Sequence, residues 1–497
     1  MRVLYIDIDS ARPDHLGCYG YDRPTSPVID EIAASGTVFT NAHVSDNPCN
    51  PSRASLFSAR FGIQNGVVGH VGPAQHLRYA GEGHFHDPAA PMWMRHLQER
   101  GWNTVSFSGF AQRHLSWWFT AGFTEFHGNK LPGGSESAAE VNDLVEPWLR
   151  ENAAGDDWFL HVNYWDVHFP YDAPEQYRRR IQNGAEPAFP NDATIRRDHD
   201  YFYGPHTARD WRPEALYPGI TAEWPGIRPA IRDRDDFMYF CDGHDAGIAY
   251  VDDCIGRLLA ILDEQGIAED TTIIIAADHG ETIGEQGVYW AHANASEGTA
   301  HIPLIIRWPG VTRPGTVNDG LLYHLDLPPT MLDLLGHEIP PGWSGESFAP
   351  ALRGDDWPGR DHLIWGMGIW TAQRAVRTRR HLFIRTLHPG LYNIDRLNLF
   401  DLEQDPWQRH NLAGSEPDLV AGHDHLLSEW WHSHCTGPGS VRDPMVDLLQ
   451  SSFRANGGRR SSGPDIDFEA AHFVAYLREQ GRPEQAADLA RRRGLPT

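Results

Sequence analysis

Residues 3–9 read Val-Leu-Tyr-Ile-Asp-Ile-Asp, and this stretch decides which class of fold the chain can adopt. From Val3 to Ile8 it is apolar apart from Asp7, which is typical of a strand buried on both faces of a parallel sheet. In open α/β sheets, ligand-binding groups gather beyond the carboxyl ends of the strands, where Asp9 follows. A carboxylate there also suits a helix cap, and Asp7 points to the same strand face as Asp9.

A second apolar run has the same design. Residues 273–277, Ile-Ile-Ile-Ala-Ala, predict another buried strand, and it ends in Asp278-His279-Gly280-Glu281. Two separate strands therefore deliver a carboxylate to the carboxyl edge of the sheet, which indicates a metal site. Oxygen-rich ligand sets suit hard cations such as Ca²⁺, Mg²⁺ or Mn²⁺, while imidazole opens the site to softer metals.

Composition narrows the class of protein. The chain has 497 residues, enough by length for about three domains, and its formal charge of -25 argues against a nucleic-acid partner. There is no apolar run near the roughly 18 residues that a membrane span needs. Since the chain opens directly with a strand and shows no secretion signal, we expect a cytoplasmic location. Five cysteines at unrelated spacings predict no disulfide framework.

The segment 47–70, NPCNPSRASLFSARFGIQNGVVGH, carries the candidate nucleophile. Pro51 suits a first helical position, which would place Cys49 beside the positive end of a helix that favours anions. Arg53, one turn further on, supplies a fixed positive charge. A lone cysteine is more often a small buried residue. A cysteine phosphatase cradle is a poor alternative, because it would place five residues between Cys and Arg where this sequence has three.

The run Cys49-x-Pro51-Ser52-Arg53, followed by a short apolar helix and Arg60, closely resembles the signature of type I sulfatases of the alkaline phosphatase superfamily. In that family a maturation enzyme oxidises the Cys to formylglycine, whose hydrated aldehyde is the nucleophile. The resemblance covers roughly residues 2–415. It implies an α/β fold with a large mixed, mostly parallel sheet flanked by helices and a smaller C-terminal antiparallel sheet domain. It also implies hydrolysis of a sulfate monoester of a carbohydrate or aryl alcohol.

The resemblance assigns roles to individual residues. One divalent metal, with Ca²⁺ favoured over Mn²⁺ or Mg²⁺, would be held by the residues in the family's ligand positions, with Asp7 as a further ligand or a neighbour of the ligands. The implied ligands are Asp9, Asp278, His279 and the formylglycine made from Cys49. Many members have a second Asp directly after the first, and here Ser10 takes that position.

Catalysis is assigned to Cys49, Arg53, His168 and His292. His168 follows the predicted strand 158–164 and resembles the family's active-site His, which protonates the leaving oxygen. His292 falls where many members place a sulfate-binding Lys.

Four residues are candidates for binding the substrate. Many sulfatases carry Gly-Lys-Trp-His after the strand predicted at 102–109, whereas this chain has Ser108 to His114 there, so Arg113 or His114 would substitute for the Lys and His. Asn65 and His70 lie in a Gly-rich loop near the far end of the predicted nucleophile helix.

Three domains are expected: a catalytic domain at 1–360, a C-terminal subdomain with the small sheet at 361–455, and a linker with a helical tail at 456–497. The tail would pack on the body or form a homo-oligomer. Residues 171–235 are a polar, Pro-rich insertion whose aromatic residues either stack on the substrate or fold back on the body.

Two rival functions remain open. Phosphonate monoester or phosphodiester hydrolases share the fold, the nucleophile and the Asp-His metal pair. A noncatalytic relative would only bind sulfated glycans. The partners implied are a sulfate ester and a formylglycine-generating or sulfatase-maturating enzyme, with no nucleic acid and no membrane.

Overall fold

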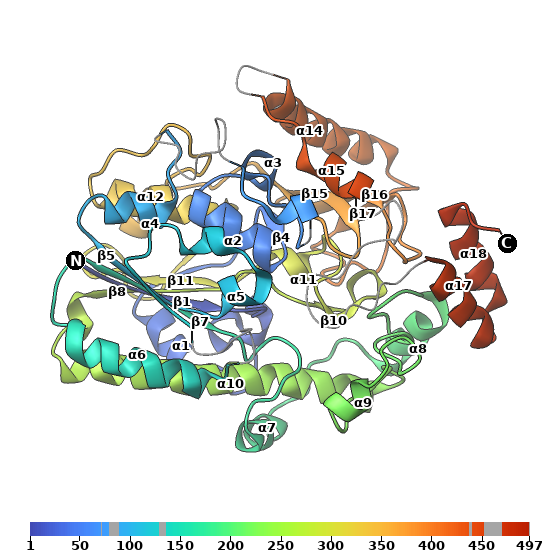
Figure 1. Cartoon of the computed structure of the whole chain (residues 1–497), viewed down its shortest axis with the longest axis horizontal. Coiled ribbons are helices and arrows are strands. Elements are labelled where there is room, and N and C mark those ends of the chain that lie inside the picture. The colour runs from blue at the N-terminus through green and yellow to red at the C-terminus, as the bar shows by residue number, and fades with distance from the viewer. Residues whose placement is uncertain (71, 79–88, 129–135, 437–439, 452–469, 497) are drawn as a thin grey trace.

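The computed structural model describes residues 1–70, 72–78, 89–128, 136–436, 440–451 and 470–496 (Figure 1). Its main sheet has eight strands in the order β12-β2-β11-β8-β1-β7-β5-β6. These are β1 (Arg2–Ile8), β2 (Thr37–Phe39), β5 (Asn103–Phe107), β6 (Glu125–His127), β7 (Trp158–Tyr164), β8 (Thr271–Ala276), β11 (Leu304–Arg307) and β12 (Thr316–Asn318).

The central strands of this sheet are parallel. β1 pairs in parallel with both β7 and β8, and β11 runs antiparallel to β8 and β2. From Val3 onward β1 is buried, as is all of β8, because helices cover both faces of the sheet (Figure 1). The predicted fold class, a mixed and mostly parallel sheet flanked by helices, is confirmed.

Helices pack on the two sides of the main sheet. One side carries α1 (Pro27–Ala34), α6 (Ala138–Asn152) and α10 (Arg234–Glu264), and the other carries α2 (Cys49–Ser58), α4 (Trp93–Gln98) and α12 (Leu327–Leu334) (Figure 1). Shorter helices lie in the connections: α3 (Gly62–Asn65), α5 (Phe110–His114), α7 (Glu175–Gln182), α8 (Asp192–Tyr201), α9 (Ile220–Glu223), α11 (Glu297–Ala300) and α13 (Ala349–Arg353). Two short pairs of strands complete this part: β3 (Ala42–His43) with β13 (Leu322–Tyr323), and β9 (Thr282–Ile283) with β10 (Tyr289–Ala291).

A second sheet has the order β17-β16-β15-β14-β4. The strands β14 (His362–Met367), β15 (Ala372–Thr378), β16 (His381–His388) and β17 (Leu397–Asp401) are antiparallel neighbours, and α14 (Pro417–Cys435) packs against β15 and β16. The fifth strand, β4 (Asp46–Asn47), comes from the N-terminal part of the chain and pairs in parallel with β14. The expected division at residue 360 therefore does not separate the two sheets, since the smaller one holds the chain directly before Cys49.

The insertion at 171–235 folds back on the body. Tyr203, Trp211 and Tyr217 are buried, and the indole N–H of Trp211 donates to the carbonyl of Tyr289 at 2.8 Å. Tyr201 is 60% exposed. For the three buried aromatic residues, packing on the body is the role that the structure shows.

The C-terminal tail forms two helices, α17 (Ala470–Glu479) and α18 (Pro483–Arg493), and these pack on each other. Arg482 binds both oxygens of Asp210 at 2.7 and 2.9 Å, and the Tyr203 hydroxyl donates to Asp488 at 2.6 Å. The tail thus lies against the insertion of its own chain. α15 (Pro444–Ser451) precedes it, and the first part of the predicted linker and tail, residues 456–469, lies outside the described residues. Where the structure describes the chain, none of its helices combines the length and apolar character of a membrane span.

Candidate active site

The carboxyl ends of β1 and β8 bring Asp9 and Asp278 together. The two strands are paired up to Asp7 and Ala276, and each carboxylate follows within two residues. The backbone N–H of Asp9 donates to the carbonyl of Tyr164 at 2.9 Å, and the N–H of Ser10 donates to the carboxylate of Asp278 at 3.2 Å. Hydrogen bonds between neighbouring strand ends therefore fix both carboxylates at one edge of the sheet.

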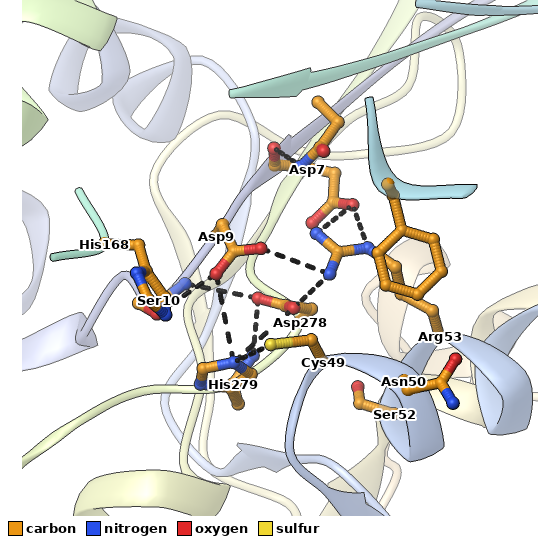
Figure 2. Close-up of polar contacts among 12 residues, drawn as sticks. Asp7, Asp9, Ser10, Cys49, Asn50, Ser52, Arg53, His168, Asp278 and His279 are labelled. Carbon is orange, nitrogen blue, oxygen red and sulfur yellow. Dashed lines mark hydrogen bonds and ion pairs between the residues drawn. The ribbon is translucent and has the colours of Figure 1, made fainter. Parts of the chain in front are cut away.

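The helix α2 delivers Cys49 to the same edge. It begins at Cys49 itself, so Pro51 is its third residue, and the prediction that Pro51 occupies the first helical position was wrong. The Cys49 sulfur lies 3.0 Å from Nε2 of His279. Figure 2 shows the side chains of Asp9, Asp278 and His279 facing this sulfur. One ligand atom from each of these four buried residues lies within 4.8 Å of the other three.

Arg53 stands beside this group, one turn further along α2. Its guanidinium donates to Asp7 at 3.0 Å, to Asp9 at 3.2 Å and also to Asp278 (Figure 2). Asp7 is not part of the four-residue group: apart from Arg53, its carboxylate contacts Nε2 of His161 at 3.2 Å. The structure thus brings Asp7 to the arginine, where it holds the guanidinium in place.

The charges in this site are unbalanced. Asp7, Asp9 and Asp278 surround Arg53, and Arg113 adds a second guanidinium at 3.2 Å from Asp9. Burial and the nearby Asp9 and Asp7 carboxylates raise the pKa of Asp278 well above its usual value, although Arg53 opposes this. A divalent cation among these oxygens would remove that repulsion.

The imidazole of His279 is oriented for the same task. Its Nδ1 donates to the carbonyl of Gly280 at 2.8 Å, so in the neutral ring Nε2 carries a lone pair directed toward Cys49. Burial lowers the pKa of His279 to about 3, which keeps the ring neutral. Two carboxylates and one neutral imidazole therefore fit a divalent metal.

The thiol of Cys49 is a poor nucleophile in this environment. Burial, together with the charges of Asp9 and Asp278, raises its pKa well above the usual value, and Arg113 and Arg53 offset this only in part. Thiolate chemistry needs a lowered pKa.

His168 and Arg113 approach from different elements. His168 follows β7, and its Nδ1 donates to the carbonyl of Phe169 at 2.7 Å, which leaves Nε2 to exchange a proton. Burial lowers the pKa of His168 to about 4. Both residues contact Trp165, which the sequence did not single out: the His168 ring stacks on it at 3.8 Å, and the Arg113 guanidinium carbon lies 3.2 Å from a ring centroid.

His292 joins the group through ring contacts. Its ring centroid lies 4.5 Å from that of His279 and 5.3 Å from that of His168. Its Nδ1 lies 3.7 Å from the carboxylate of Glu281, which also accepts from the Tyr171 hydroxyl. Burial would raise the pKa of Glu281, but the contacts with His292 and His168 lower it to about 2. The adjacency of Glu281 to the Asp278-His279 pair was the signal that could have identified it.

The remaining three predicted residues separate into two sets. His70 accepts from the backbone N–H of Asn50 at 3.1 Å, and its ring lies 4.8 Å from that of His114, so both are near the start of α2. The Asn65 side chain instead donates to the carbonyl of Arg60 at 3.0 Å and accepts from the N–H of Val67 at 2.9 Å. The structure therefore places Asn65 at the C-terminal end of α3 and not with the other candidates.

Comparisons with known proteins agree with this geometry. The family model described as Sulfatase matches residues 2–337, and one described as N-sulphoglucosamine sulphohydrolase, C-terminal, matches residues 284–424. An ulvan-active sulfatase from Formosa agariphila is 24% identical, with 83% of this chain and 77% of that protein covered.

Two solved structures show the same fold. One protein, in complex with its substrate D-glucosamine-2-N,6-O-disulfate, superposes with a TM-score of 0.68 at 18% identity, covering 86% of this chain and 97% of the other. A phosphonate monoester hydrolase from Silicibacter pomeroyi gives a TM-score of 0.65 at 22% identity, covering 89% and 99%. Since the Sulfatase family model matches more than half of its length, the chain belongs to the sulfatase family of the alkaline phosphatase superfamily and is a sulfuric ester hydrolase.

Proposed function

We propose that the protein hydrolyses a sulfate monoester through a formylglycine made from Cys49 and one divalent metal, with Ca²⁺ favoured over Mn²⁺ or Mg²⁺. The observation that carries this proposal is the convergence of Asp9, Cys49, Asp278 and His279 within 4.8 Å at the start of α2. Asp9, Asp278, His279 and residue 49 would hold the metal, which when bound stabilises negative charge on oxygen.

The charge of the site suits a monoanion. Three carboxylates and two guanidinium groups leave one negative charge in the innermost contacts, and a divalent cation would change it to one positive charge. A sulfate monoester carries a single negative charge and would balance it. A doubly charged phosphate monoester would leave a net negative charge and is disfavoured, whereas a singly charged phosphonate monoester is the alternative substrate.

The hydrated aldehyde would supply one hydroxyl to displace the alcohol from sulfur and a second whose deprotonation expels sulfate. Arg53 offsets negative charge near residue 49, and Arg113, His70 and His114 are proposed to bind the sulfate oxygens. His168 is neutral with its proton on Nδ1, so Nε2 is proposed to take up the proton that the attacking hydroxyl of the hydrated aldehyde would lose and to pass it to the leaving oxygen. His292 is proposed as a further sulfate-binding group. The raised pKa of the Cys49 thiol supports a modified nucleophile over a thiolate.

A carbohydrate is the proposed alcohol, with an aryl alcohol as the alternative. The name of the ulvan-active relative and the disulfated glucosamine in the solved structure support a sugar. We further propose a cytoplasmic location, a maturation enzyme as the one macromolecular partner, and a tail that packs within its own chain and not between subunits. The tail's contacts with Asp210 and Tyr203 support the last point.

Two measurements test the proposal. Peptide mass spectrometry of material made with a maturation enzyme should show residue 49 about 18 mass units lighter than cysteine. Parallel kinetics on an aryl sulfate and an aryl phosphonate monoester should then show the higher kcat/KM for the sulfate. A large preference for the phosphonate would contradict the assigned substrate, and no turnover by protein that carries both formylglycine and metal would favour a noncatalytic sulfated-glycan-binding relative.

A further inference from the structure

The side chain of Trp165 contacts two charged or titratable groups of the site at once. It directly follows β7, whose last residue, Tyr164, accepts the hydrogen bond from the N–H of Asp9. The guanidinium of Arg113 lies 3.2 Å from a Trp165 ring centroid, and the His168 ring stacks on Trp165 at 3.8 Å with an interplanar angle of 20°. Trp165 is half-buried, so part of its surface serves these contacts and part faces solvent.

The Arg113 side chain has few other contacts that fix its position. It belongs to the five-residue helix α5, and its other polar contacts are with Asp9 at 3.2 Å and with Nε2 of His114 at 3.1 Å. The Arg113 side chain is 8% exposed, so little solvent reaches its guanidinium. An aromatic face attracts a cation most strongly under these desolvated conditions.

The imidazole ring of His168 also needs a contact that fixes its orientation. The hydrogen bond from its Nδ1 to Phe169 fixes one edge of the imidazole, but one bond leaves the ring free to rotate about it. Stacking on Trp165 fixes the plane of the ring and therefore the direction of Nε2. The same indole thus sets the position of a cation and the direction of a proton-exchanging nitrogen.

We propose that Trp165 is a positioning residue that holds Arg113 against the sulfate group and aligns His168 with the leaving oxygen. The inference rests on the proposed sulfate hydrolysis at this site. It also explains how the chain functions without the Gly-Lys-Trp-His run: the cation comes from α5 and is held by an aromatic side chain directly after β7.

The test compares three variants of the full-length, metal-loaded protein. Trp165→Leu removes the aromatic face, and Trp165→Phe keeps a smaller one. Trp430→Leu is the matched control, because Trp430 is also half-buried and packs on an arginine, Arg374, at 5.4 Å, but on the distant helix α14.

Two readouts separate positioning from packing. The first is the affinity for inorganic sulfate by titration calorimetry, which reports on Arg113 and requires no turnover. The second is the ratio of kcat values for 4-nitrophenyl sulfate and phenyl sulfate, because the poorer leaving group depends more on a proton from His168. Thermal unfolding of each variant reports on packing alone.

We expect Trp165→Leu to weaken sulfate binding about 3- to 30-fold, and to slow phenyl sulfate more than 4-nitrophenyl sulfate. Trp165→Phe should stay within about threefold of the wild-type protein, and Trp430→Leu should leave both readouts unchanged. Wild-type protein that binds sulfate no more tightly than Trp165→Leu would overturn the proposal, whether or not it turns over sulfate esters. An unchanged leaving-group ratio, or equal losses in Trp165→Leu and Trp430→Leu, would overturn it too. Wild-type protein that binds sulfate with the expected Trp165 dependence but hydrolyses no sulfate ester would contradict the proposed function alone.

Discussion

Two buried clusters of aspartate and histidine lie next to each other in this protein, joined through the backbone of Ser10. The first contains Asp9, Asp278 and His279, and the N–H of Ser10 donates to Asp278 at 3.2 Å. The second contains His15, His244 and Asp245, and Nε2 of His244 contacts the carbonyl of Ser10 at 3.4 Å. Each brings its possible ligand atoms within 4.8 Å of one another.

The clusters differ in the charges that surround their carboxylates. Asp245 accepts from His15 at 2.6 Å, from the Tyr21 hydroxyl at 2.7 Å and from Arg23 at 2.7 Å. Although burial opposes ionisation, the contacts with His15 and His244 lower the pKa of Asp245 well below its usual value.

In the first cluster the pKa of Asp278 moves the other way, because burial and two further carboxylates outweigh Arg53. The same residue types therefore make a structural ion pair in one cluster and a candidate metal site in the other. Each carboxylate accepts three hydrogen bonds from nitrogen or oxygen donors. The difference therefore lies in the Asp7 and Asp9 carboxylates beside Asp278, which have no counterpart among the groups that lower the pKa of Asp245.

The largest effect expected from breaking the first cluster is on the reaction. Cys49→Ala should lower kcat/KM on the order of 10⁴-fold or more, since it removes the residue that we propose as the source of the nucleophile. The melting temperature should change little, because the variant loses only the sulfur atom of one buried side chain. Activity measured beside a circular dichroism melt checks both points, and a variant that keeps a tenth of the wild-type rate would refute the role of residue 49.

A pair of matched variants tests the difference between the clusters. Asp245→Asn should reduce the free energy of unfolding by about 3–5 kcal/mol, because it leaves a buried arginine with one partner fewer. Asp278→Asn should abolish activity and remove the rise in Tm that the wild-type protein shows when the divalent metal is added back after chelation.

The metal-free Tm should fall less in Asp278→Asn than in Asp245→Asn, since the former relieves repulsion among Asp7, Asp9 and Asp278. Differential scanning calorimetry with and without chelator makes the comparison. If the rise in Tm on adding metal were lost in Asp245→Asn but kept in Asp278→Asn, the second cluster and not the first would be the metal site.

A variant at Asp7 tests whether this carboxylate positions Arg53 or binds the metal. Asp7→Asn keeps the shape of the side chain but weakens the charged hydrogen bond from Nε of Arg53 at 3.0 Å and removes the ion pair with Nη2 at 2.9 Å. We expect kcat/KM to fall about 10- to 100-fold, because a hydrogen bond to a charged group contributes about 1.5–3 kcal/mol. Metal content by plasma mass spectrometry should stay the same.

Asp443→Asn is the matched control for Asp7→Asn, since Asp443 is a buried partner of Arg374 at 2.7 Å in another part of the chain. Loss of metal from Asp7→Asn would show that Asp7 is a ligand after all.

The last effect is on the pH dependence of stability and concerns another buried carboxyl, Asp46, which is held mainly by neutral donors, the N–H of Gly62 at 2.7 Å and the Ser55 hydroxyl at 3.1 Å. Burial raises its pKa to about 7. Between pH 4 and 7 the folded state keeps this proton while the unfolded state releases it, so this contribution to stability is complete below about pH 4 and is lost as the pH rises through 7.

Asp46→Asn removes that dependence. The stability of the variant relative to the wild-type protein should increase from pH 4 to pH 7, with a slope of at most about 1.4 kcal/mol per pH unit. Denaturant melts at several pH values measure it, and a flat difference would mean that Asp46 is ionised in the folded protein.

Several features could be predicted from local sequence because they depend on local pattern. The apolar runs at 3–8 and 273–277 identify central strands, because a strand buried on both faces needs apolar side chains on both sides. Asp9 and Asp278 follow those runs, and parallel neighbouring strands end at the same edge, which brings the two residues together. The spacing of Cys49, Pro51, Ser52 and Arg53 carried the resemblance to the family.

Other features depend on contacts between residues far apart in the chain. Asp7 binds Arg53, Trp165 contacts Arg113, and β4 joins a sheet formed by residues 362–401. The periodicity of the sequence does not predict such contacts, because the same residue could contact a different partner in another fold.

The sequence by itself determined the strands, the helix that carries Cys49 and the residue types at the reaction centre, because these follow from backbone periodicity and short motifs. Only the tertiary structure decided which aspartates are neutralised by arginine or histidine and which are left facing one another. The physical reason is that the ionisation of a buried carboxylate depends on every charge and donor around it, and folding alone brings those groups together.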